Sequence, residues 1–289
     1  MLILGEIMGK LLFFSDIHLE HDGLREKGLE EIISSANQEN VNKIVFGGDV
    51  MGHSSVVAAE ALEKDYEIDS AVAYNSIAKA QYMLFDKIMS GFSGEKHGIH
   101  GNHDPIGFYE TIKSFDFEPN SEIGKVYLPT INVGGGGAEL RYFHEGWDRI
   151  EIGCDENKMK QAFDEKPPIM LWHQGPHDKI YGTAEDGSEV KYECPEEFKK
   201  LGEEASINLY GHNHGSFVKY DAAKNKFDIN MTTQDGFYAI VEYDDSYNPI
   251  ACEVYKIDDV ANHEPDINKS AGFFYEQIAS KLENNQENQ

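Results

Sequence analysis

The stretch Lys96-His97-Gly98-Ile99-His100-Gly101-Asn102-His103-Asp104 decides how the rest of the chain is interpreted. Residues 96–100 predict the end of a buried strand, and the glycine after them predicts a tight turn. That turn brings three polar side chains to one point. Asn102 offers a neutral carbonyl oxygen, His103 an acid or base near neutral pH, and Asp104 a carboxylate that can orient the histidine. Such turns are common, so the segment gains its meaning from four further polar clusters.

Each of the other clusters also follows a predicted strand. In open α/β sheets, ligands bind outside the carboxyl ends of the strands, so we expect all five segments to meet at one rim. The cluster residues are Asp16 and His18 after KLLFF, Asp49 after KIVF, Asn102, His103 and Asp104 after HGIH, His173 after IMLW, and His212 and His214 after INLY.

The residue types in these clusters favour a transition-metal site. Imidazoles mixed with carboxylate and amide oxygens suit Mn, Fe, Zn or Ni better than Ca or Mg. The Asp16-x-His18 and His212-x-His214 spacings place two side chains on the same side of an extended segment, because strand side chains repeat every two residues. One segment can then supply two ligands to one centre or to adjacent centres.

The composition predicts a single globular domain without affinity for nucleic acid. The 289 residues contain 40% hydrophobic residues, and the net charge of −27 comes from 52 acidic against 25 basic residues. Non-specific nucleic-acid binding needs clusters of Lys and Arg, which this chain lacks. The three cysteines are far apart, which predicts reduced thiols in a cytoplasmic protein. No apolar run of about 18 residues exists, so no membrane span is expected.

The order of the predicted elements indicates an α/β fold in which the last third is rich in strands. Residues 1–282 are expected to form one domain and 283–289 a polar tail. The final three strands are expected to form an antiparallel set, and Ser54 or Ser55 and then Ser70 to cap two helices. Strands are expected at 10–14, 43–46, 96–100, 126–133, 138–144, 169–172, 207–210, 227–231, 237–243 and 251–257. Helices are expected at 22–37, 54–67, 70–89, 155–165, 195–201 and 272–282.

Taken together and in this order, the motifs D-x-H, G-D, G-N-H-D, a lone His and G-H-x-H resemble those of the calcineurin-like metallophosphoesterase superfamily. The resemblance covers residues 11–215, about three quarters of the chain. It implies a four-layer α/β/β/α sandwich of two mixed sheets flanked by helices, and two divalent metal ions, with Mn favoured.

The resemblance also implies a role for each cluster residue. Asp49 would bridge the two ions. His103 would act as general acid or stabilise the transition state, with Asp104 orienting it. The first metal would be bound by Asp16, His18, Asp49 and His214, and the second by Asp49, Asn102, His173 and His212.

Three features of the sequence bear on the subgroup within this superfamily. The protein Ser/Thr phosphatases of the superfamily carry Arg beside these motifs, and this chain has none there, which argues against that subgroup. Residues 54–90 hold two predicted helices that are expected to be an insertion shaping the substrate pocket. Trp172–Thr183 resembles the H-x-P-P…Y-G-T segment of small prokaryotic members, with Gly175-Pro176 in place of Pro-Pro.

These features predict a phosphohydrolase that attacks a small phosphoester or nucleotide with a hydroxide activated by two metals. A phosphodiesterase is favoured, because an intact G-N-H-D supplies an acid for a poor alkoxide leaving group. A phosphomonoesterase and a nuclease like the DNA-repair members are the alternatives among enzymes. A non-catalytic scaffold, like the retromer subunit of the superfamily, is the alternative of another class, although such a scaffold is expected to have lost ligands.

Overall fold

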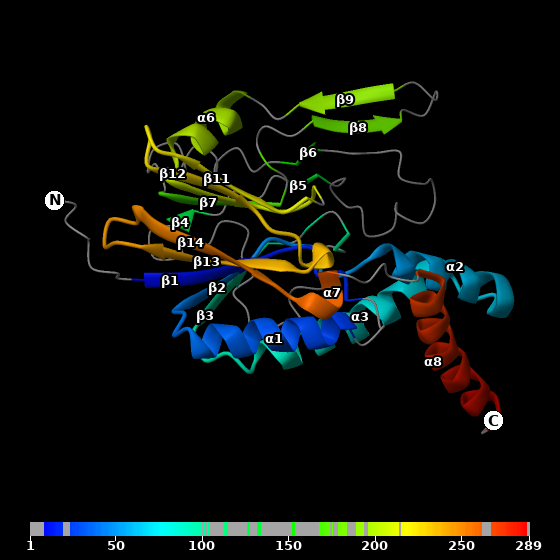
Figure 1. Cartoon of the computed structure of the whole chain (residues 1–289). Helices are drawn as coiled ribbons and strands as arrows, with labels where there is room; N and C mark the ends of the chain where they lie inside the picture. Colours follow the sequence, from blue (N-terminus) through cyan, green and yellow to red (C-terminus); the bar gives the residue numbers. More distant parts are fainter. Residues whose placement is uncertain are drawn as a thin grey trace.

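Two five-stranded mixed sheets lie face to face, with helices on their outer sides (Figure 1). The α/β sandwich of two mixed sheets flanked by helices expected from the sequence is thereby confirmed. The computed structural model describes residues 9–19, 24–99, 101, 103–104, 113–114, 126–127, 132–133, 152–153, 168–173, 175, 179–183, 189–193, 196–213, 215–261 and 267–287.

The first sheet has the strand order β14-β13-β1-β2-β3. Strands β1, β2 and β3 run parallel to one another, whereas β13 pairs antiparallel with both β1 and β14. Phe14, Phe46 and Gly98 are in register across the three parallel strands, so the loops after them leave the sheet at one level. The strands are β1 (Gly9–Phe14), β2 (Lys43–Phe46), β3 (Glu95–Gly98), β13 (Phe237–Tyr243) and β14 (Pro249–Lys256).

The second sheet has the order β11-β12-β10-β7-β4. Here β7, β10 and β12 are parallel, and Trp172 and Tyr210 are partners at the carboxyl ends of β7 and β10. The expectation that residues 227–231 join the last two strands in an antiparallel set was wrong, because β12 belongs to this sheet. The strands are β4 (Val126–Tyr127), β7 (Ile169–Trp172), β10 (Ile207–Tyr210), β11 (Phe217–Asp221), which was not expected, and β12 (Lys226–Asn230).

Two short antiparallel pairs stand apart from the main sheets. The strand expected at 126–133 is two strands, β4 in the second sheet and β5 (Asn132–Val133), which pairs with β6 (Ile152–Gly153). A hairpin of β8 (Lys179–Thr183) and β9 (Glu189–Glu193) was not anticipated from the sequence. The strand expected at 138–144 and the helix expected at 155–165 lie outside the described residues.

The alternating side chains of β1 explain the layering. Leu11 and Phe13 pack into the core between the two sheets, while Leu12 and Phe14 pack into a second core under the helices. Because successive side chains of a strand point to opposite faces, one apolar strand serves both cores. On the outer side of the second sheet, Asn208 Nδ2 donates to the Gly202 carbonyl of α6 at 2.7 Å, which ties that helix to β10.

The helices differ from expectation mainly at their ends. Neither Ser54 nor Ser55 caps α2, because its cap is Gly52 and no side chain makes the capping bond. The cap of α3 is Asp69, whose carboxylate accepts the N–H groups of Ala71 and Val72, rather than Ser70. The helices are α1 (Leu24–Gln38), α2 (His53–Tyr66), α3 (Ser70–Met89), α6 (Glu196–Glu204), α7 (Asp258–Ala261) and α8 (Ile267–Glu287).

The last helix, α8, runs to Glu287 and so includes most of the segment expected to be a polar tail. It packs on α2 beside the first sheet (Figure 1). Within the described part of the chain, no helix is both long and apolar enough to cross a membrane.

Candidate metal centre

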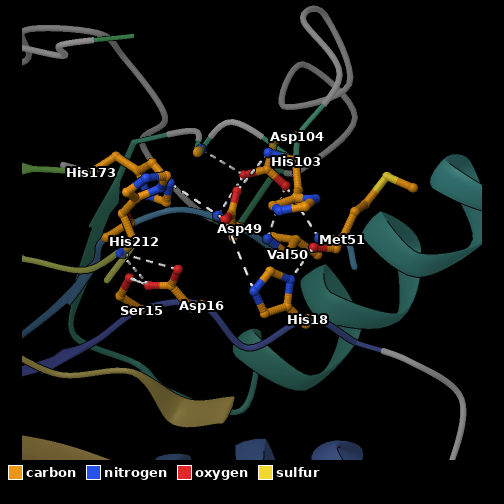
Figure 2. A network of polar contacts seen from close by, with 12 residues as sticks. Ser15, Asp16, His18, Asp49, Val50, Met51, His103, Asp104, His173 and His212 are labelled. Atoms are coloured by element: carbon orange, nitrogen blue, oxygen red, sulfur yellow. Dashed lines mark hydrogen bonds and ion pairs between the residues drawn. The ribbon is translucent and has the colours of Figure 1, made fainter. Parts of the chain in front are cut away.

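Five loops meet at the carboxyl ends of the parallel strands of both sheets, as the sequence predicted. Asp16 and His18 follow β1, Asp49 follows β2, and His103 follows β3. From the second sheet, His173 follows β7 and His212 follows β10. Figure 2 shows these side chains turned toward one another around the Asp49 carboxylate.

Asp49 is the central group. Its Oδ2 lies 3.4 Å from His173 Nε2 and 4.0 Å from His18 Nε2, and Figure 2 shows the two rings on different sides of the carboxylate. Its Oδ1 accepts the backbone N–H of His103 at 2.8 Å. One carboxylate therefore has ligand-type atoms of two different loops within reach, which is the position that a bridging ligand needs.

Asp16 completes a compact donor group. One ligand atom each from Asp16, Asp49 and His173 lies within 4.8 Å of the others, and all three residues are buried. The Asp16 carboxylate accepts the backbone N–H of His212 at 3.0–3.1 Å and the Ser15 hydroxyl. The ring of His212 stacks edge-on against that of His173, with 5.2 Å between centroids.

Backbone carbonyls fix the orientation of the two buried histidines. The Nδ1 of His173 is 2.8 Å from the Gly47 carbonyl oxygen, and the Nδ1 of His18 is 2.5 Å from that of Met51. In a neutral ring whose Nδ1 donates its hydrogen to the carbonyl, Nε2 presents its lone pair toward Asp49; His173 reaches this form when it loses the proton that the Asp49 carboxylate favours. This arrangement is the usual one for metal-ligating histidines, whose second ring nitrogen donates to a carbonyl or carboxylate. Buried carboxylates and oriented imidazoles together fit a divalent transition metal.

The backbone around the centre is strained. Asp16, His18, Asp49 and His212 all have positive φ, at 50°, 43°, 62° and 64°. Residues other than glycine visit this region at a cost of roughly 1–3 kcal/mol, and they cluster at functional sites. Short bonds between the loops maintain it: Asp16 N donates to the Gly48 carbonyl at 2.8 Å and His18 N to that of Asp49 at 3.1 Å.

Two glycines provide room for the donors. A Cβ on Gly101 would overlap Asp49 Oδ1 and lie 2.6 Å from His173 Cε1. A Cβ on Gly211 would overlap the Asp16 carboxylate in the same way. The close approach of backbone to carboxylate therefore requires glycine as the first residue of the G-N-H-D and G-H-x-H segments.

Charge and burial act against each other in the centre. Burial opposes ionisation of Asp49, yet the neighbouring His173 lowers the pKa of its carboxyl. Burial likewise opposes the charged form of His173, but the Asp49 carboxylate raises its pKa to about 10. Burial, with a contribution from Asp49, raises the pKa of Asp16 to about 7. Burial lowers the pKa of His18 well below its usual value, so that imidazole is neutral, the form in which it can bind a metal.

The hydrogen-bond partners of Asp104 are backbone N–H groups, whereas the sequence analysis expected the ring of His103. Its Oδ2 accepts the N–H groups of Asp49 and Gly101 at 2.8 and 2.9 Å, and its Oδ1 those of Val50 and Met51 at 2.9 and 3.3 Å. The expectation was that this carboxylate orients the His103 ring. The bonds found instead bind the loop that carries Asp49 to the loop that carries His103.

The structure thus brings together most of the residues selected from the sequence. Those that lie around Asp49 are Asp16, His18, His103, Asp104, His173 and His212. Asn102 and His214 lie outside the described residues, so their assignment as ligands stays a prediction. Sequence reasoning missed Ser15, and it missed Tyr74, Gln81 and Tyr82 of α3, which contact the site loops. Of these, only Tyr74, Gln81 and Tyr82 could have been indicated by the sequence, through their spacing on one face of a helix.

Comparison with known proteins agrees with this geometry. The profile described as calcineurin-like phosphoesterase matches residues 9–216, which is more than half of the chain. The chain belongs to the calcineurin-like phosphoesterase family. The resemblance seen in the motifs is thereby confirmed, and the matched range contains every residue that was assigned to the site.

Solved structures support the fold of this calcineurin-like phosphoesterase. A dimetal phosphatase from Danio rerio superposes with a TM-score of 0.53 at 9% identity, covering 87% of this chain and 99% of that one. A putative 5'-nucleotidase from Staphylococcus aureus matches at 12% identity and a TM-score of 0.52, covering 93% of this chain and 58% of that one. A search of curated proteins found no match. At such low identities the likeness is one of fold.

Proposed function

We propose that this protein is a metal-dependent phosphohydrolase, most simply a phosphodiesterase, that acts on a small phosphoester or nucleotide. The observation that carries the proposal is the buried group of Asp16, Asp49 and His173, whose ligand atoms lie within 4.8 Å of one another at the rim where five loops meet. Membership of the calcineurin-like phosphoesterase family supports the reaction class.

The proposed metal ligands form two sets that share Asp49. When bound, two divalent ions, with Mn favoured, supply Lewis acidity and positive charge for the phosphate oxygens. Asp49 lies between the rings of His173 and His18, which suits a shared ligand. The first set is Asp16, His18, Asp49 and His214, and the second is Asp49, Asn102, His173 and His212.

His103 is the proposed proton donor. Its ring is in edge contact with that of His18, with 5.1 Å between centroids, so it lies beside the proposed ligands. In hydrolysis the oxygen of water bonds to phosphorus and the bond from phosphorus to the leaving oxygen breaks. His103 gives its proton to that leaving oxygen, and the proton released by the attacking water passes to solvent, from which the imidazole is reprotonated. An alkoxide needs this proton far more than a nitrophenolate does, so the acid suits a diester of an alcohol.

The charge of the chain supports a small substrate over a polynucleotide. The net charge of −27 repels a phosphate backbone at long range, whereas a single phosphodiester has few charges to repel. Small phosphoesters are therefore the proposed partners, and a nuclease activity is the outcome that this argument opposes.

The test combines metal content with turnover. Elemental analysis of the purified protein is followed by hydrolysis of bis-p-nitrophenyl phosphate and p-nitrophenyl phosphate with added Mn. Two metals per chain and faster cleavage of the diester support the proposal. Preference for the monoester assigns a phosphomonoesterase instead. Absence of both bound metal and turnover refutes an enzymatic function and favours the alternative of a non-catalytic scaffold.

Two variants then separate the roles. Asp49→Ala is expected to lose metal, because it removes the carboxylate shared by both sets. His103→Ala is expected to keep its metals and to lose about 10²–10⁴-fold in turnover of a poor leaving group. Full activity of His103→Ala on such a substrate would show that His103 is not the acid.

A further inference from the structure

One face of α3 reaches the loops that carry the proposed metal ligands and the proposed acid. Tyr74, Gln81 and Tyr82 are seven and eight residues apart, which places them on the same side of a helix. All three are buried, with at most 3% of their surface exposed. Polar groups as deeply buried as these need specific partners, and their partners lie in the site.

Tyr74 holds the backbone of the proposed acid. Its hydroxyl donates to the carbonyl oxygen of His103 at 3.1 Å. On the other side of the same residue, the His103 N–H donates to Asp49 Oδ1 at 2.8 Å. Both backbone polar groups of His103 are therefore held by side chains from other elements. These two bonds limit displacement of the His103 backbone, and with it displacement of the imidazole.

The other two residues tie the same helix to the remaining loops. Gln81 Nε2 donates to the carbonyl of Leu19, next to His18, and its Oε1 accepts the Ser55 hydroxyl of α2 at 3.1 Å. Tyr82 lies beside Asp104, the carboxylate that joins the loop of Asp49 to that of His103. Helix α3, part of the segment expected to be an insertion that shapes the substrate pocket, thus contacts the loops after β1 and β3.

We propose that Tyr74 is a positioning residue for His103, and that α3 acts as a rigid support that sets the distance from the acid to the metal ligands. This inference rests on the proposed function, since it assigns Tyr74 a role only if His103 protonates a leaving group. A positional error of about 1 Å in a reacting group can cost roughly 10²-fold in rate. Loss of one hydrogen bond that limits such movement is expected to cost less.

The substitution that tests this is Tyr74→Phe, which removes the hydroxyl and keeps the ring. We expect kcat for a phenyl phosphodiester to fall about 5–20-fold and kcat for the p-nitrophenyl analogue less than about 2-fold, because a good leaving group has little need of the acid. KM and metal content are expected to stay unchanged. Tyr220→Phe is the matched control, since it removes a hydroxyl that bonds to Asn225 at 2.9 Å on an exposed part of β11. An equal loss on both substrates would refute positioning and indicate general destabilisation.

A double-mutant cycle sharpens the test. If Tyr74 acts through His103, Tyr74→Phe has no further effect on kcat in the His103→Ala background. If the two losses multiply, the residues act independently and the inference is wrong.

Hydrogen exchange of the metal-free protein provides a readout besides activity. The backbone amide of His103 is expected to exchange faster in Tyr74→Phe than in the wild type, and at the wild-type rate in Tyr220→Phe. Unchanged exchange in Tyr74→Phe would overturn the claim that the phenol holds this loop. A wild-type protein without turnover of either ester would refute the proposed function and the positioning role of Tyr74 with it, while the exchange result would still decide whether Tyr74 holds the His103 backbone.

Discussion

Replacing Asp104 by Asn should destabilise the protein strongly, although the two side chains have the same shape. Each carboxylate oxygen of Asp104 accepts two backbone N–H groups, from Asp49 and Gly101 on one side and from Val50 and Met51 on the other. An amide has only one oxygen, so its NH2 group would face two N–H donors. Asn can therefore satisfy at most one of the two pairs.

The magnitude follows from the two bonds that are lost. Hydrogen bonds to a charged acceptor contribute about 1.5–3 kcal/mol each, and Asn at position 104 no longer carries the cost of a buried charge. Burial raises the pKa of Asp104 to about 6, so the carboxyl is mostly ionised at neutral pH. We expect a net loss of about 3 kcal/mol, which corresponds to a fall in Tm of roughly 6–12 °C for a chain of this size.

The assay is thermal unfolding followed by circular dichroism at neutral pH with a chelator present, so that metal binding does not contribute. Asp69→Asn is the matched control, because there a single oxygen, Oδ1, accepts both N–H groups at the start of α3. Asn is as good a helix cap as Asp, so that variant should stay within about 0.5 kcal/mol of the wild type. A change of under about 1 kcal/mol in Asp104→Asn, or an equal loss in both variants, would refute this reasoning.

Three further predictions concern the centre and the one cysteine that the structure describes. Gly101→Ala should reduce metal affinity about 10–10²-fold by calorimetry, because its Cβ would overlap the Asp49 carboxylate. Gly272→Ala, with nothing within 4 Å of its Cβ, should leave affinity unchanged. Metal affinity should fall as pH is lowered, by about tenfold per unit for each proton displaced, because the pKa of His173 is raised to about 10 and a ligand must be deprotonated; affinity independent of pH would contradict this. Cys252 should react with iodoacetamide roughly 10³-fold more slowly than a free thiol near pH 8, because burial raises its pKa to about 12 and only the thiolate reacts. Peptide mapping of native and urea-unfolded protein measures the ratio of the two alkylation rates. Equal alkylation rates in the native and unfolded protein would refute the prediction.

The sequence was sufficient for the general architecture and for the position of the site. Apolar runs such as KLLFF and KIVF are strand signals that depend on local composition. The polar residues directly after them lie at strand ends wherever the strands pair in parallel. Asp49 and His173 are far apart in the chain, yet each follows a buried strand, and their convergence follows from that placement.

Local patterns failed where non-local pairing decided the outcome. Residues 227–231 directly precede the last two strands in the sequence, which favoured pairing with them, but β12 pairs with β10 in the other sheet. The start of α3 shows the same limit on a smaller scale. Asp69 and Ser70 are both good caps by type, and the backbone geometry selected the aspartate.

The sequence alone therefore determined which residues are available for the chemistry and on which rim they gather, because both depend on residue type and strand period. Only the tertiary structure decided how those residues are held. The four bonds from backbone N–H groups to Asp104 and the bond from Tyr74 to His103 join segments that are 29 to 55 residues apart, apart from the one to Gly101. A single sequence contains no local signal for such contacts, because their partners are backbone groups, which every residue possesses.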